Sequence, residues 1–319
     1  MKRRGCMPLL AGLGLMYALP LSAQQRKPAR VGVLVLANWE RAFASFNEAL
    51  AGLGHVEGKN LIFEMRSAQG KPEALTGMAQ QLVELNVDVI AAFQTPSADA
   101  ARRATKVIPI VMAGVADPVA VGLVDSLARP GGNVTGVASM ATELSAKNLE
   151  FVREIKPAAK RVGVLANATD PFTPKMLDHL QVAASATGLE LLPSKVRRAD
   201  EVSGVFAQWA AQRVDAVFVQ GSVPVARAAE LALQYRLPSV SFVRAFAEAG
   251  GLFVYGADLR DQQRKAARLV DKILKGAKPA DLPVEQPTIF DVIVNAKTAK
   301  ALGIKIPHSV LLRATEVIE

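Results

Sequence analysis

Short apolar segments alternate with helical segments along most of the chain, and this alternation constrains the fold more than any other feature. Between residues 30 and 112 the pattern predicts strands at 30–37, 60–66, 87–93 and 108–112, separated by helices at 41–53, 72–85 and 95–105. The strands are apolar on both faces, which is typical of parallel sheets covered by helices on both sides. We therefore predict an α/β fold.

The alternation restarts after the glycine-rich break at 130–132. The second run begins with RVGVLANAT at 161–169, which is similar in sequence to RVGVLVLAN at 30–38. Its strands are expected at 161–166, 189–196, 216–219 and 239–242, and its helices at 143–155, 171–187, 199–212 and 223–235. The repetition predicts two similar lobes, each an open parallel sheet, with a ligand cleft between them.

Beyond residue 250 the pattern predicts a strand at 252–255, a long amphipathic helix at 258–275, a strand at 288–294 and a short helix at 296–302. One helix between two strands can return the chain to the first lobe and then take it back to the second. We therefore place lobe 1 at 29–135 plus 254–287 and lobe 2 at 136–253 plus 288–319. The chain would cross between them near 133–139, 250–256 and 287–294.

The first 23 residues have the order of a secretory signal peptide. A basic segment at 2–4 precedes an apolar run at 7–21 and the small pair Ser22–Ala23. The run is short and is broken by glycine and proline, which favours a cleaved signal over a permanent membrane span. Cleavage would lower the formal net charge from +9 to +6, since three basic residues leave. Cys6, the one cysteine, would leave too, so we expect a periplasmic protein without disulfides.

The sequence offers no strong sign of catalysis or of nucleic-acid binding. Its basic residues are spread out beyond the signal segment, and the three histidines at 55, 179 and 308 show no metal-ligand spacing. The segment 52–60 is too long for a phosphate loop and follows a helix, and the first strand lacks a dinucleotide-type glycine motif. We expect no cofactor, no metal and no nucleic-acid partner. An enzyme would have to work with Asp117 and Asp170 alone.

Four strand-to-helix turns share one design, in which a cap-forming residue precedes a proline in the first helical turn. They lie at 94–97, 116–118, 169–171 and 221–224. Helix N-termini carry unpaired N–H groups and partial positive charge, so they bind carboxylates or phosphates. Because ligands of parallel α/β proteins bind at the carboxyl ends of the strands, the four turns are candidates for the wall of the cleft. Each can equally be a plain helix start.

The two acidic turns receive different interpretations. The segment 109–139 predicts a strand, then a helix from Pro118 that ends before Pro130, then a second strand at 134–138. Asp117 would start this helix and also face the crevice, where it would suit an ammonium group; helix capping is the alternative. Asp170 would also suit an ammonium group, but we favour a capping role for it. Among the aromatic residues, Trp39 is the first candidate for stacking on a planar ligand, and Tyr255 is the other candidate for contacting an apolar or planar part of it. Phe93 and Phe242 have the pattern of core residues.

The segment PIVMAGVADPVAVGLVDSLARPGGNVTGVAS at 109–139 resembles the signature of the ABC transporter substrate-binding proteins whose studied members bind tryptophan or tyrosine. HVEGKNLIFEMRSAQG at 55–70, DVIAAFQTPSADAARRAT at 88–105 and the long segment 247–307 are similar as well. The resemblance covers roughly residues 30–316, nearly the whole chain after the signal segment. It implies a type I periplasmic-binding fold that closes on its ligand and delivers it to a membrane permease.

The resemblance also implies ligand contacts. They would fall on Thr95, Ser97 and the Asp117 loop in lobe 1, and on Asn167, Thr169, Gly221, Ser222 and Phe242 in lobe 2. We therefore expect an exported, monomeric, non-enzymatic protein that captures a small organic ligand, an amino acid or similar zwitterion, for an ABC importer. The alternative is a periplasmic sensor of the same fold that presents its ligand to a receptor or kinase.

Overall fold

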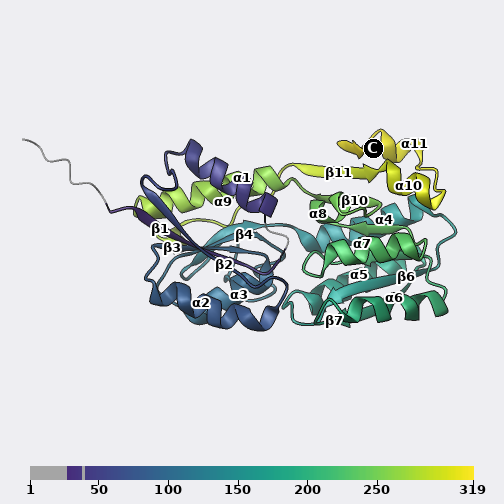
Figure 1. Cartoon of the computed structure of the whole chain (residues 1–319), viewed down its shortest axis with the longest axis horizontal. Helices are drawn as coiled ribbons and strands as arrows, with labels where there is room; N and C mark the ends of the chain where they lie inside the picture. Colours follow the sequence, from purple (N-terminus) through teal and green to yellow (C-terminus); the bar gives the residue numbers. More distant parts are fainter. Residues whose placement is uncertain (1–26, 38–39) are drawn as a thin grey trace, which may run out of the picture.

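The computed structural model describes residues 27–37 and 40–319, and it divides into two α/β lobes that lie side by side along the long axis of the molecule (Figure 1). The expected signal peptide at 1–23 and the stacking candidate Trp39 lie outside the described residues. The predicted fold class is confirmed: each lobe is an open sheet with helices on both faces.

The first lobe is built on an entirely parallel sheet with the strand order β2-β1-β3-β4-β5. Its elements are β1 (Ala29–Val35), α1 (Glu40–Gly52), β2 (Leu61–Ser67), a 3-10 turn (Pro72–Ala74), α2 (Leu75–Glu84), β3 (Val89–Phe93), α3 (Thr95–Ala104), β4 (Ile110–Val115), β5 (Val134–Ala138) and, much later in the chain, α9 (Leu259–Leu274). Helices α1 and α9 pack on one face of this sheet, and α2 and α3 pack on the other. The strands are buried on both faces because helices cover both, which is why they contain almost only apolar residues.

The second lobe has the strand order β12-β11-β10-β9-β8-β6-β7. Its elements are α4 (Ala141–Ile155), β6 (Arg161–Asn167), α5 (Thr173–Thr187), β7 (Glu190–Val196), α6 (Glu201–Ala211), β8 (Ala216–Val219), α7 (Val225–Gln234), β9 (Ser239–Ser241), α8 (Arg244–Glu248), β10 (Phe253–Ala257), a 3-10 turn (Pro279–Asp281), β11 (Phe290–Asn295), α10 (Ala296–Leu302), α11 (His308–Leu311) and β12 (Glu316–Ile318). The sheet is parallel except where β10 pairs with β11. The sequence pattern did not predict α8, α11 or β12, which have three to five residues each.

The chain changes sheets after β5, after β10 and before β11. All of β5 pairs with β4, and Gly136, at φ +143°, lets the two strands approach closely, since a Cβ there would lie 2.4 Å from the backbone of Met112. All of β10 belongs to the second sheet, so the second crossing begins at Asp258. Glu285 still bridges to Val137 of β5, which puts the third crossing at 286–289. The expected boundaries at 135/136 and 253/254 therefore cut through β5 and β10.

One predicted helix is wrong. The segment after Pro118 forms a series of turns, in which the N–H groups of Leu123 and Val124 both donate to the Pro118 carbonyl. Gly122 takes a positive φ of +68°, which ends any helical path, and Leu123 and Val124 turn into the core of the first lobe. The apolar residues of this segment are spaced as in a helix because the turns bury them in the core, and this spacing explains the wrong prediction.

Candidate functional site

A cavity lies where the carboxyl ends of the two sheets face each other. It is lined by residues that follow β1, β3 and β4 in the first lobe and β6, β8 and β9 in the second. In the first sheet β1 and β3 are neighbours from which the chain turns in opposite directions, and β6 and β8 have the same relation in the second. Such a switch point is where open parallel sheets bind ligands. The volume of the cavity is about 150 Å³.

The first-lobe wall contains the N-terminus of α3. Thr95 is buried, and its Oγ1 accepts a hydrogen bond from the Ala116 N–H at 3.2 Å. Before it, Gln94 has an unusual backbone with φ +70° and ψ 157°. Its side chain accepts from the Ala37 N–H at 3.3 Å and donates to the Gly221 carbonyl of the other lobe at 3.4 Å. A strained residue that bonds both lobes is typical of a functional site.

The second-lobe wall contains a buried carboxylate, that of Asp170. Its oxygens accept hydrogen bonds from Ser222 Oγ at 2.6 Å, from Gln220 Nε2 at 3.0 Å and from the Phe172 N–H at 2.9 Å. Burial raises the pKa of the Asp170 carboxyl; the bonds from Ser222 and Phe172 oppose this rise, and the charge of Asp99 adds to it. An amine or ammonium group in the cavity would relieve the cost of ionising this carboxyl.

The orientation of the Gln220 side chain is fixed by hydrogen bonds to its amide oxygen. Its Oε1 accepts from the Asn167 N–H at 2.7 Å and from Thr173 Oγ1 at 3.0 Å, which leaves its Nε2 to face Asp170. Asn167 also donates from Nδ2 to the Ser222 carbonyl at 2.9 Å, so it fastens the β6 and β8 turns to each other. The polar cluster around Asp170 is therefore preorganised.

Most of the remaining wall is apolar. It includes the rings of Phe93, Phe172 and Phe242 and the side chains of Ala42 and Leu144. Phe172 is fully buried, and the Phe242 ring packs at 6.0 Å from that of Phe218. A few polar groups within an apolar wall are typical of a pocket for a small organic ligand.

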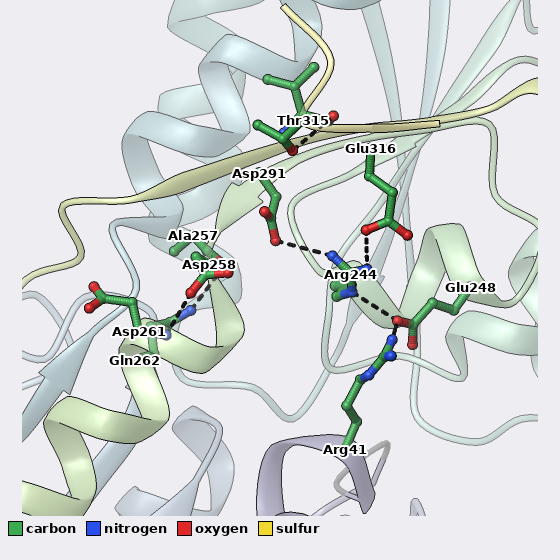
Figure 2. Close-up of polar contacts among 11 residues, drawn as sticks. Arg41, Arg244, Glu248, Ala257, Asp258, Asp261, Gln262, Asp291, Thr315 and Glu316 are labelled. Atoms are coloured by element: carbon green, nitrogen blue, oxygen red, sulfur yellow. Dashed lines mark hydrogen bonds and ion pairs between the residues drawn. The ribbon is translucent and has the colours of Figure 1, made fainter. Parts of the chain in front are cut away.

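An ion-pair network closes one side of the cavity and joins the lobes (Figure 2). Arg41 of α1 pairs with Glu248 of α8. Arg244 bonds Glu248 at 2.9 Å, Asp291 of β11 at 3.5 Å and also Glu316 of β12. Burial and the nearby charge of Asp258 raise the pKa of Asp291, although Arg244 opposes them. Arg41 belongs to the first lobe, whereas Arg244 and its acidic partners belong to the second. Arg41 therefore contacts Glu248 only when the two lobes are together.

Four of the predicted contact residues line the cavity: Thr95, Gly221, Ser222 and Phe242. Asn167 lies behind the wall as a support, and Thr169 borders a separate groove between the lobes. Tyr255 is not part of the lining; its ring stacks on Phe290 at 6.0 Å.

Two predicted residues of the first lobe are also absent from the lining. Ser97 is fully buried on α3, and its hydroxyl has no partner among the described residues. Asp117 starts a turn in place of a helix, where its Oδ1 accepts from the Ala120 N–H at 3.0 Å. Its neighbour Ala116 does reach the cavity.

Sequence reasoning favoured a cap for Asp170. It missed much of the polar lining, namely Arg41, Gln94, Gln220, Arg244, Glu248, Gln262 and Gln263. A usable signal existed for two of them. Gln94 and Gln220 occupy equivalent positions, directly after β3 and β8, at the strand ends where ligands bind.

No set of three or more potential metal-ligating residues converges anywhere in 27–37 or 40–319. Within the same ranges, every helix is too short or too polar to span a bilayer.

Comparison with known proteins identifies the type of site. Residues 37–318 match the family described as ABC transporter substrate binding protein. A tyrosine-binding protein from Clostridioides difficile is 29% identical over 289 residues, which are 88% of this chain and 82% of the relative. The match confirms the resemblance found in the sequence, and, because this family consists of binding proteins, it confirms that the chain is not an enzyme.

Two solved structures of similar sequence differ in how well they superpose. An ABC domain from Streptococcus pneumonia in complex with L-Trp is 27% identical, covers 92% of this chain and all of its own, and has a TM-score of 0.85. The ligand-free, open structure of a substrate-binding protein from Clostridium difficile is 28% identical, covers 91% of this chain and 99% of its own, and has a TM-score of 0.63. At similar sequence identity, the chain as a whole superposes better on the ligand-bound structure than on the open one.

Proposed function

Because the chain belongs to the ABC transporter substrate-binding protein family, we propose that it captures a free L-amino acid with an aromatic side chain and presents it to an ABC permease for import. The observation that carries this proposal is the buried Asp170 carboxylate, which faces an otherwise largely apolar cavity. A carboxylate buried in the wall of a cavity can be stabilised by the cationic group of a ligand.

The two ends of the amino-acid group have separate partners in this proposal. Asp170 accepts the ammonium group, with Ser222 and Gln220 holding the carboxylate in place. The ligand carboxylate binds at the N-terminus of α3, where Thr95 lines the cavity and the first N–H groups of the helix lack intrahelical partners. Positive ligand charge thus contacts the second lobe and negative charge the first, so the ligand itself links the lobes.

The side chain of the ligand occupies the apolar part of the cavity. Phe93, Phe172 and Phe242 supply aromatic surface there, and edge-to-face or offset contacts with a ligand ring would contribute beyond simple burial. The names of the relatives, a tyrosine-binding protein and a complex with L-Trp, support this ligand class. Gly221, Ser222 and Phe242 are the second-lobe contacts that we propose; Trp39, Ser97, Asp117, Asn167, Thr169 and Tyr255 stay predictions.

Capture and delivery take place outside the cytoplasm in this proposal. The segment 1–23 supports export, and the network of Arg41, Glu248 and Arg244 supports a lobe arrangement that closes over the ligand. A permease would recognise the closed form, as hinge closure makes one surface from two lobes. We expect the protein to act as a monomer in the periplasm.

The direct test is calorimetric titration of residues 24–319 with the proteinogenic L-amino acids, together with thermal unfolding, since a ligand that binds the folded state raises its midpoint. We expect L-Tyr or L-Trp to bind most tightly. Tyramine and tryptamine, which lack the carboxylate, and the corresponding 2-hydroxy acids, which lack the ammonium group, serve as matched controls and should each bind at least about tenfold more weakly. Equal binding of amino acid and 2-hydroxy acid would refute the role of Asp170, and failure of every aromatic amino acid would refute the proposed ligand class.

A further inference from the structure

Gln263, on the first turns of α9, has a buried side-chain oxygen without a hydrogen-bond partner among the described residues. The residue is 1% exposed, and its Oε1 is buried with no partner among the residues that the structure describes. The other glutamines of the cavity are bonded: Gln220 to Asp170, Gln94 to Gly221, and Gln262 to the Ala257 carbonyl at 3.2 Å (Figure 2 shows Gln262 beside Ala257). Buried polar groups are nearly always paired, so an unpaired amide oxygen on a residue that lines a cavity suggests a partner supplied by a ligand.

The position of α9 tells which part of the ligand would reach Gln263. Helix α9 packs against α1 on one face of the first sheet, and α3 lies on the opposite face. Arg41 and Ala42 of α1 line the cavity together with Gln263. The cavity therefore has one end formed by α1 and α9 and another formed by the start of α3.

The groups that would hold the ammonium and the carboxylate are at the α3 end. Thr95 is the first residue of α3, and the turn that carries Asp170 borders α3 as well, since Thr169 and Pro171 share a second groove with Pro96 and Asp99. A ligand with its amino-acid group at this end directs its side chain toward α9. Gln263 then faces the far end of the side chain.

We infer that Gln263 recognises a hydrogen-bonding group at the tip of the ligand side chain, a hydroxyl or a ring N–H. The inference rests on the proposed function and deepens it, because it selects, among aromatic amino acids, those with a polar tip. A primary amide both donates and accepts, so it can pair with either kind of tip. A ligand with an apolar tip leaves the amide buried and unpaired, and sites built this way discriminate strongly against such ligands.

The experiment measures dissociation constants for two matched ligand pairs, L-Tyr with L-Phe and L-Trp with 1-methyl-L-Trp. The parent protein should prefer the polar-tipped member of at least one pair by about tenfold or more. Gln263→Met, which keeps the size of the side chain and removes its amide, should abolish that preference and leave the affinity for the apolar-tipped member unchanged or higher. Gln208→Met, on the exposed surface of α6, is the control and should behave like the parent.

The outcomes separate this inference from the proposed function. Binding of all four ligands by the parent without preference, or an unchanged preference in Gln263→Met, overturns the role of Gln263 and leaves the proposed function intact. If the parent binds none of the four ligands, both the proposed ligand class and the role of Gln263 are refuted. If circular dichroism shows that Gln263→Met is poorly folded, Gln263→Leu replaces it, and the preference of the parent within each ligand pair is compared with that of Gln263→Leu.

Discussion

Asp117 and Asp170 occupy turns that look alike in the sequence and differ in the folded protein. Each follows a buried strand and precedes a proline. Asp117 begins a partly exposed turn and accepts one backbone N–H, from Ala120. Asp170 is 6% exposed, accepts three hydrogen bonds and lines the cavity.

The difference comes from what faces each turn across the fold. Asp170 is enclosed because Gln220 and Ser222, about fifty residues later, follow the neighbouring strand β8 and donate hydrogen bonds to its carboxylate. Asp117 has no such side-chain partner among the described residues, and the segment behind it turns into the core of the first lobe. An acidic residue before a proline therefore indicates a turn, whereas its partners on other strands decide whether it can serve a ligand.

The largest effect that we expect is from Asp170→Asn. Loss of a buried charge-assisted hydrogen bond of about 1.5–3 kcal/mol corresponds to a ten- to hundredfold weaker affinity for the amino-acid ligand. The unliganded variant should differ little from the parent in stability at neutral pH, because two changes oppose each other. It no longer ionises a buried carboxyl, whose pKa burial raises, but the asparagine NH2 cannot accept from the Ser222, Gln220 or Phe172 donors. Calorimetric titration and thermal unfolding measure the two quantities. Parental affinity in this variant would remove Asp170 from the site.

A smaller effect, which also distinguishes Asp170 from Asp117, is the pH dependence of ligand binding. An ammonium group requires the ionised form of Asp170, and the pKa of this carboxyl is raised by burial. Below that pKa the folded, empty protein holds a proton on Asp170 that must leave before the ligand binds. Affinity should therefore fall by up to about tenfold per pH unit as the pH is lowered through this raised pKa.

The control for the pH effect is Asp170→Asn, whose weaker affinity should be flat over the same range. Titrations in buffers of different ionisation enthalpy should also report proton release on binding by the parent. If the affinity of the parent rises on acidification, the ammonium is not paired with Asp170.

The smallest effect that we expect is from Asp117→Asn, the matched substitution in the other turn. Asparagine can accept the Ala120 N–H as aspartate does, and position 117 does not line the cavity. Affinity should stay within about twofold of the parent and the melting temperature should hardly change. A loss of tenfold or more would restore the sequence-based prediction of Asp117 as the ammonium partner.

Much of the fold could be predicted because the helices and strands have strong local patterns. The strand VIAAF at 89–93 is wholly apolar, and α9 carries a clear apolar stripe that packs against α1. The errors concern segments whose structure depends on distant contacts. The turns after Pro118 have apolar residues at helical spacing, but these residues are spaced to fit the core of the first lobe. Helix α8 and strand β12 are too short to show a periodic pattern of apolar residues.

By itself the sequence determined the alternation of strands and helices, the restart of the pattern and the strand-end turns, because each depends on residues close together in the chain. It also carried the family resemblance, which the comparison confirmed. Only the tertiary structure decided which polar groups face the ligand. Separate strands and helices bring Asp170 to Gln220 and Arg41 to Glu248 at one cavity, where the Gln263 Oε1 has no partner among the described residues. Burial at this cavity changes which partners each polar group requires.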